Sequence, residues 1–294
     1  MGFEDRIFNN IDKSRERRQE LSPAMERAHT KARTMLKDPE YVIQERSFSH
    51  IYGEEGVRAD MAKVTRLRSG CDIRQTEYER NSKKIAEILE AVLIEESEMS
   101  EWFGENATTM KASDYDDFIN KVDMLTEWHS PGEGMRMLVL AVDVTFGRES
   151  IYKKMEQIRQ EIDSGMLGSI KYFTDTRGDF MGMRNNVPRI VLGVSQPVVE
   201  ELAHLWTSGE KAKLGEHPIQ RVFAIQMRAQ LQAMRDYAAR RGQSAAVSAY
   251  ENALGAVEPI EVAKRHMPLG SLIQDPVARE ISQQTTSQFE QRKS

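Results

Sequence analysis

Two neighbouring stretches decide the fold: Lys121–Trp128, with the sequence KVDMLTEW, and Met135–Phe146, with the sequence MRMLVLAVDVTF. In the first stretch Met124 faces one way and Asp123 and Leu125 face the other, which is the period-two pattern of a strand. The second stretch is a β-branched and apolar run, typical of a sheet that is covered on both faces. We therefore predict two successive strands of a small mixed sheet, joined by the turn-forming residues HSPGEG.

Helical patterns surround these strands. Apolar residues recur at helical spacing over residues 81–104 and again over residues 149–166. Two more short strands are predicted over residues 169–173 and 188–194, with a glycine-bearing loop over residues 174–186 between them. The sequence thus predicts an α/β (α+β) fold, in which a small mixed β-sheet is flanked by helices.

Composition divides the chain into four parts. Residues 1–80 are charged and only thinly apolar, and we expect them to form an exposed helical arm. Residues 81–215 form the α/β core, and residues 216–260 form a helical cap, divided at Gly242, that packs on that core. Residues 261–294 are rich in Gln, Ser and Thr, which predicts a mostly disordered tail.

Charge and cysteine content exclude several classes of protein. The chain has 294 residues and a net charge of -5, so its overall charge gives no nucleic-acid footprint. Its single cysteine, Cys71, excludes internal disulfides, zinc ribbons and iron–sulfur clusters. No apolar run approaches the ~20 residues of a membrane helix, and the N-terminus lacks a secretory signal. We expect a cytoplasmic protein that does not enter a membrane.

Two aspartates interrupt the predicted strands. Asp143 lies inside the apolar run LVLAVDVTF, where an ionised carboxylate is costly unless it is paired or binds a metal. Asp123 lies in the preceding strand, so a hairpin would bring both carboxylates to one face. Two such carboxylates suit Mg²⁺ or Mn²⁺. Alternatively, each aspartate only closes a strand end or caps a turn.

Lysines that could assist such a site occur in two places. Lys171 lies between apolar residues in the strand IKYF, and we predict that it points to the sheet face that holds Asp143. Lys153 and Lys154 lie at the start of the helix that follows Asp143. Near a metal site, a lysine can stabilise the charge that develops on phosphorus. The other interpretation of Lys153 and Lys154 is a solvated helix face.

The order of helix, Asp-bearing strand, second acidic strand, helix and strand resembles the PD-(D/E)XK nucleases, the restriction-endonuclease-like superfamily. More narrowly, the resemblance is to an uncharacterised group of predicted bacterial and metagenomic proteins, and it covers roughly residues 85–257. It is carried by these phrases: YDDFINKVDMLTEW, LVLAVDVTF, IKYF, NNVPRIVLGV, ELAHLW, HPIQR and YAARRGQ.

The resemblance implies catalytic roles for particular residues. Asp123 matches the first aspartate of the nuclease motif, and Asp143 matches the acidic residue of the (D/E)XK triplet. The triplet here ends in Thr145, so the catalytic lysine would have to come from elsewhere. The candidates for that lysine are Lys171 and Lys154. The acidic residue that this superfamily often adds from its first helix would be Glu96 or, as a second choice, Glu95.

The resulting hypothesis is an enzyme: a Mg²⁺- or Mn²⁺-dependent hydrolase that cleaves phosphodiester bonds of nucleic acid, DNA more than RNA. The alternative is a non-catalytic nuclease-fold scaffold or interaction protein. In either case the helical arm offers a surface for assembly, including homo-oligomers. The basic residues expected to bind the nucleic-acid backbone are Arg177, Arg184, Arg189, Arg66 and Arg68.

Overall fold

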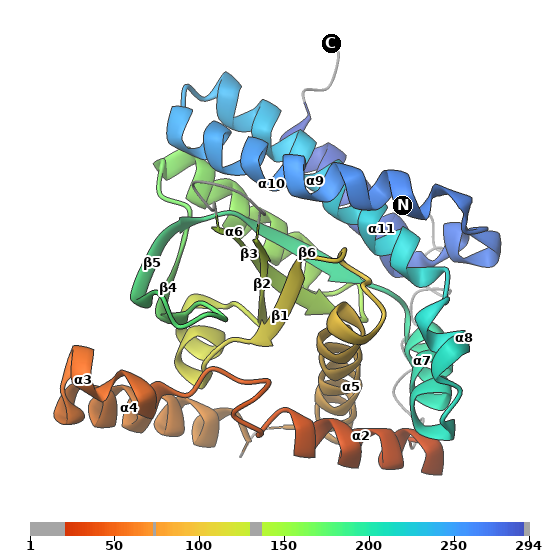
Figure 1. The fold of residues 1–294 in the computed structure, drawn as a ribbon, viewed down its shortest axis with the longest axis horizontal. Coiled ribbons are helices and arrows are strands. Elements are labelled where there is room, and N and C mark those ends of the chain that lie inside the picture. Colours follow the sequence, from red (N-terminus) through yellow and green to blue (C-terminus); the bar gives the residue numbers. More distant parts are fainter. Residues whose placement is uncertain (1–20, 73–74, 130–136, 291–294) are drawn as a thin grey trace, which may run out of the picture.

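The computed structural model describes residues 21–72, 75–129 and 137–290 (Figure 1). Predictions for residues 1–20 of the arm, for the turn after His129 and for the last four residues lie outside the described residues. Within these ranges the mixed α+β class predicted from the sequence is confirmed.

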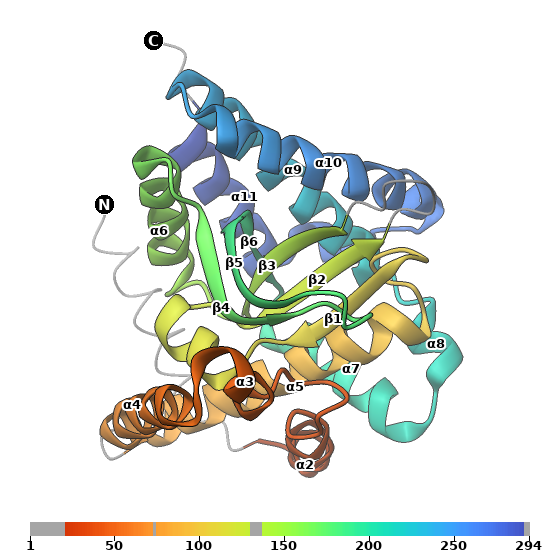
Figure 2. The same ribbon diagram turned by 60° about the vertical axis from the view of Figure 1, so that its left-hand side comes forward.

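A four-stranded mixed sheet forms the centre of the molecule, in the order β1-β2-β3-β6. Strands β1, β2 and β3 form an antiparallel meander, and β6 lies parallel to β3. A separate two-stranded antiparallel sheet, β4-β5, crosses one side of the central sheet (Figure 2). The strands are β1 (Ala107–Lys111), β2 (Met124–His129), β3 (Met137–Thr145), β4 (Gly168–Thr174), β5 (Met181–Val187) and β6 (Arg189–Gly193).

The two faces of the central sheet have separate cores, as the alternation in β2 predicted. Met124 and its cross-strand partner Val142 belong to the larger apolar cluster, which the helices cover. Leu125 and its partner Ala141 belong to a smaller cluster, which β4 and β5 cover. Because side chains alternate along a strand, Asp123 and Asp143 belong to the same face as Leu125 and Ala141.

Helices enclose the larger core. The capping box of Thr76 and Glu79 begins α5, the helix that packs on β1. The longer helices are α2 (Pro23–Met35), α4 (Glu54–Asp72), α5 (Glu77–Met99), α6 (Ile151–Ser164), α7 (Gln196–Ser208), α9 (Ile219–Arg240), α10 (Ser244–Ala263) and α11 (Pro276–Phe289). Short helical segments are η1 (Glu45–Phe48), α3 (Ser49–Tyr52), η2 (Asp116–Asn120), α8 (Lys211–Gly215), η3 (Lys264–His266) and η4 (Gly270–Gln274).

The prediction of an exposed arm is wrong for α2. Met25, Ala28 and Ala32 of this helix are buried in the larger core, where α2 packs against α5 and α7. The apolar stripe of α2 is narrow because it contains small alanines. These alanines let the helices approach closely. The stripe is therefore an interface, although it carries few large side chains.

The prediction of a mostly disordered tail is also wrong. Helix α11 buries Val277, Ile281 and Phe289 against the core. Asp275 caps this helix by accepting hydrogen bonds from the backbone N–H groups at its start, and it also accepts one from the N–H of Ser195. Three apolar residues on one stripe are enough to dock a helix whose composition is otherwise polar.

The predicted packing of the C-terminal helices is confirmed. Ile219, Phe223 and Leu231 of α9 are fully buried, whereas Ile225 of the same helix is 37% exposed. The structure contains two strands that the sequence pattern does not predict: β1, and β5, most of which lies in the predicted glycine-bearing loop. Both are short, and β5 is strongly polar, so their period-two patterns are weak.

Candidate functional site

The side chains of Asp123 and Asp143 converge at one end of the central sheet, as predicted. Asp123 immediately precedes β2, and the pairing of Met124 with Val142 brings it opposite Asp143. Asp123 Oδ2 accepts a hydrogen bond of 2.6 Å from the backbone N–H of Val144. This bond fixes the first carboxylate against the strand that carries the second.

Lys154 connects the two carboxylates. It lies in the first turn of α6, and its Nζ donates to Asp143 Oδ1 at 3.3 Å and to the carbonyl oxygen of Val144 at 3.0 Å. The same Nζ lies 3.6 Å from Asp123 Oδ2. One ammonium group is thus surrounded by three oxygen atoms from two strands. The lysine is positioned because α6 begins only a few residues after β3 ends.

Burial dominates the electrostatics of this group. Asp143 is only 4% exposed, and burial together with the nearby charge of Asp123 raises its pKa to about 6, against the opposing effect of Lys154. Burial alone would lower the pKa of Lys154, but the two aspartates outweigh it and hold the pKa above its usual range. The ammonium therefore remains charged while Asp143 titrates near neutrality.

A second group of charges adjoins the first. Lys111, at the end of β1, places its Nζ 2.9 Å from a carboxylate oxygen of Glu90 and 3.5 Å from one of Asp117. Burial, together with the charge of Asp123, raises the pKa of Glu90 to about 7, against the opposing effect of Lys111. Asp123 thus interacts electrostatically with both lysines. Together the two groups hold four carboxylates and two ammonium groups.

Glu90, rather than Glu96, is the helix acid beside this site. The two residues are six positions apart on α5, about 240° around the helix, so they point in different directions. Glu96 instead accepts a hydrogen bond from Ser100, and Glu95 accepts one from Trp206. The signal that could have identified Glu90 is its place in the middle of the helix's longest apolar run, Ile88–Ile94.

Lys171 lies in a different region from the one predicted. Its strand, β4, is not part of the central sheet, and its Nζ pairs with Asp60 of α4 rather than with Asp143. The strand turns Ile170 toward the central sheet, so the next side chain, Lys171, points away from it. The Nζ is 5.0–5.5 Å from the ring centroids of three tyrosines: Tyr52, Tyr115 and Tyr172.

Arg189 does not lie on the surface, so its predicted role in gripping nucleic acid is wrong. It is 2% exposed, and its Nη2 donates to the carbonyl oxygen of Asn120 at 2.6 Å and pairs with Glu161 at 3.3 Å. Its Nη1 lies 3.8 Å from Asp143 Oδ2. Arg189 therefore supports Asp143 from within the core.

The other predicted nucleic-acid ligands are dispersed. Arg66 on α4 and Arg177 in the turn of the β4–β5 hairpin are exposed. Arg184 lies beside the ring of Phe180, and Arg68 pairs with Asp114 at 2.8 Å. Two of these four arginines come from α4 and two from the β4–β5 hairpin.

Thr145, where the nuclease motif has lysine, has a local structural role. Its hydroxyl donates to the carbonyl oxygen of Gly147 at 2.9 Å and so stabilises the turn between β3 and α6. A positive charge nevertheless reaches this site, because the side chain of Lys154 enters it from α6.

The donors of the site are suited to a hard cation. The atoms around the Lys154 ammonium are carboxylate and carbonyl oxygens, the ligands that Mg²⁺ and Mn²⁺ prefer. In the described ranges, however, no group of three or more His, Cys, Asp or Glu side chains is arranged to hold a metal ion. A cation at this position would therefore rely on two side chains, one backbone carbonyl and water.

Comparison with known proteins adds no relative: no family model, no curated protein and no solved structure matches the chain. None of the described helices is long and apolar enough to cross a membrane.

Proposed function

We propose that this chain is a metal-dependent phosphodiesterase that hydrolyses nucleic acid. One observation carries the proposal: the ammonium of one half-buried lysine, Lys154, contacts the carboxylates of Asp123 and Asp143 and the carbonyl oxygen of Val144. A hydrolytic site for phosphodiesters needs this combination of carboxylates and a cation at one point. The resemblance of the sequence to the PD-(D/E)XK nucleases, which assigns roles to the same two aspartates, is in keeping with the proposal.

Asp123, Asp143 and the Val144 carbonyl would hold Mg²⁺ or Mn²⁺. When bound, such an ion lowers the pKa of water and neutralises the negative charge that develops on the phosphoryl group. Lys154 would then turn its ammonium toward the phosphate oxygens, where it stabilises the same charge. Lys154 lies in the first turn of α6, and its flexible four-carbon side chain allows this shift.

Glu90 and Lys111 set the electric field beside this centre. Glu90 has a pKa of about 7, which is the range in which a carboxylate can accept a proton at neutral pH. Lys111 offsets part of the negative charge of Glu90 and Asp117 and so limits their repulsion of an approaching phosphate. Arg66 and Arg177 are the exposed positions from the predicted set that are suited to backbone contacts.

The test is a cleavage assay with the full chain. Single- and double-stranded DNA and RNA are incubated with Mg²⁺ or Mn²⁺, and wild type is compared with Asp143→Asn and Lys154→Met. Lys153→Met is the matched control, because Lys153 is exposed on the adjacent position of the same helix. We expect metal-dependent cleavage, with DNA the better substrate, that both site variants abolish and the control retains.

A non-catalytic scaffold is the second candidate. It is favoured by the pairing of Asp143 with both Lys154 and Arg189, which leaves the carboxylate stabilised without a metal. Absence of cleavage from all four substrates, with the fold intact, would support this candidate. A cytoplasmic location and assembly through the N-terminal helices belong to both proposals and remain predictions.

A further inference from the structure

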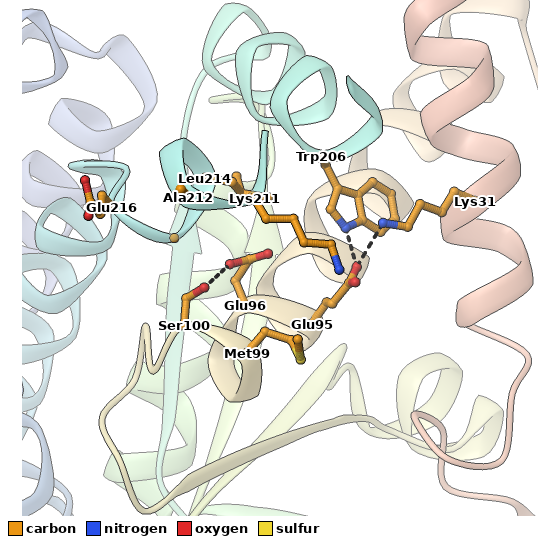
Figure 3. Close-up of a pocket in the computed structure, with 11 residues that line it drawn as sticks. Lys31, Glu95, Glu96, Met99, Ser100, Trp206, Lys211, Ala212, Leu214 and Glu216 are labelled. Carbon is orange, nitrogen blue, oxygen red and sulfur yellow. Dashed lines mark hydrogen bonds and ion pairs between the residues drawn. The ribbon is translucent and has the colours of Figure 1, made fainter. Parts of the chain in front are cut away.

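A cavity of about 390 Å³ lies between α2, α5, α7 and α8 (Figure 3). None of the residues of the carboxylate–lysine site lines it, so its chemistry is independent of the proposed cleavage. Its volume is in the range of small-molecule sites. The residues that line this cavity include Lys31, Glu95, Glu96, Met99, Trp206 and Lys211.

The buried carboxylate of Glu96 faces this cavity with half of its hydrogen-bonding capacity unused. Glu96 is only 5% exposed. One oxygen accepts a hydrogen bond of 2.6 Å from the hydroxyl of Ser100, and its other oxygen has no partner among the described residues. Burial and the neighbouring charge of Glu95 raise the pKa of this carboxyl group, against the hydrogen bond from Ser100 and the charges of Lys31 and Lys211. A hydrogen-bond donor of a bound ligand would give the second carboxylate oxygen of Glu96 a partner.

Glu95, the neighbouring acid, is already satisfied. Its carboxylate pairs with Lys31 at 3.2 Å and accepts a hydrogen bond from the indole N–H of Trp206. The ammonium of Lys31 also lies 3.8 Å from the centre of the Trp206 ring. Lys31 and Glu95 therefore neutralise one another, and they leave the cavity's remaining charge to Glu96.

Lys211 provides the opposite charge. It is exposed at the start of α8, and its side chain extends across the opening between Glu95 and Glu96 (Figure 3). No carboxylate in the described chain lies within ion-pair distance of it, whereas Lys213 on the same helix pairs with Glu210. The cavity thus presents a carboxylate with one oxygen free of protein partners and an ammonium without an ion pair, and the charge of Lys211 already acts weakly on Glu96. Met99, which is 65% exposed, adds an apolar surface beside them.

We propose that this cavity binds a free α-amino acid with an apolar side chain. Its ammonium would pair with Glu96, its carboxylate with Lys211, and its side chain would pack on Met99 and the indole of Trp206. A simple amine would satisfy Glu96 but lie close to the Lys211 ammonium. A simple carboxylic acid would satisfy Lys211 but be repelled by Glu96. Only a zwitterion matches both groups.

Isothermal titration calorimetry with the full chain tests the proposal. The three probes are L-leucine, isoamylamine, which lacks the carboxylate, and 4-methylpentanoate, which lacks the amine. We expect saturable binding of L-leucine only, weakened at least about tenfold by Glu96→Gln and by Lys211→Met, since each removes a charge-assisted contact. Lys213→Met should bind as wild type does. Thermal unfolding of each variant verifies that it is folded.

Two results would overturn the proposal. One is the absence of saturable L-leucine binding to folded wild-type protein. The other is binding of isoamylamine as tight as that of L-leucine and unaffected by Lys211→Met, which would make the cavity a cation site instead. Neither result bears on the cleavage assay, because no residue changed here contacts Asp123, Asp143 or Lys154.

Discussion

Lys154 and Lys171 make an instructive pair, because their side chains are almost equally buried, at 23% and 24% exposure. Lys154 contacts two carboxylates and a backbone carbonyl. Lys171 contacts one carboxylate, that of Asp60, within a ring of three tyrosines. The apolar flanks of Lys171 made it the stronger candidate in the sequence, but the structure places the other lysine between the aspartates.

The difference between the two regions is one of charge balance. Around Lys171 one positive and one negative charge cancel, and the hydroxyl of Tyr172 donates a further hydrogen bond of 2.7 Å to Asp60. Around Lys154 the carboxylates of Asp123 and Asp143 face the ammonium of Lys154 and the guanidinium of Arg189. With the adjoining Glu90, Asp117 and Lys111, four carboxylates face three cationic groups. The first arrangement stabilises the contact between α4 and β4, whereas the second has capacity for another cation. A buried lysine alone therefore does not indicate a site.

The largest expected effect separates the two regions by activity. Asp143→Asn removes a charge that would hold the metal, and we expect cleavage to fall by at least about a hundredfold. Asp60→Asn changes the carboxylate partner of Lys171 and should leave cleavage within about twofold of wild type, assayed well below its unfolding temperature. Equal losses in both variants would show that the Lys171 region belongs to the site.

The second effect concerns stability and its recovery by metal. Lys171→Met leaves Asp60 without its ion pair and should cost about 1–3 kcal/mol of unfolding free energy in urea titrations. Lys154→Met leaves Asp123 and Asp143 to repel one another, and added Mg²⁺ should restore much of the loss. Mg²⁺ should not stabilise Lys171→Met more than wild type. A similar Mg²⁺ response in both variants would contradict the distinction.

The third effect is a pH dependence of metal binding. The pKa of Asp143 is raised to about 6, so its proton competes with a cation below that pH. Mn²⁺ affinity, measured by calorimetry, should therefore be constant above about pH 7 and fall by roughly tenfold for each pH unit below 6. Asp60→Asn should retain this profile. Affinity that does not change between pH 5 and 8 would exclude Asp143 as a ligand.

The smallest effect involves Glu127, which lies on the same sheet face as Asp123 but pairs with neither Lys154 nor Lys171. Burial raises its pKa to about 7, aided by Asp175 and opposed by the N–H of Thr176 and by Arg184. The folded state therefore holds a proton that the unfolded state has released, and stability declines as pH rises from about 4.5 to 7. The Nε2 atom of His129 lies 3.4 Å from the Glu127 carboxylate.

Glu127→Gln should remove this decline. The unfolding free energy of Glu127→Gln minus that of wild type should be about 2 kcal/mol larger at pH 8 than at pH 5. Glu251→Gln, on an exposed position of α10, is the control and should follow the wild-type profile. Parallel pH profiles for Glu127→Gln and wild type would show that Glu127 is ionised throughout this range.

Prediction from the sequence succeeded where a local pattern has one physical meaning. The period-two alternation around Met124 and the apolar run around Val142 identified two neighbouring strands and the shared face of Asp123 and Asp143. It failed for β1 and α11, whose apolar positions are few. In those segments the decisive stabilisation comes from contacts with distant residues, such as that of Asp275 with Ser195, which no local window contains.

By itself, the sequence determined that two aspartates lie side by side on one sheet face, because strand alternation and register follow from local spacing. Only the tertiary structure decided which groups surround them. Glu90, Lys111 and Lys154 come from a helix, an edge strand and another helix, and Lys171 is directed away. A side chain's partner across elements depends on how those elements pack, and electrostatic attraction between charges distant in sequence is realised only once packing has set the distance.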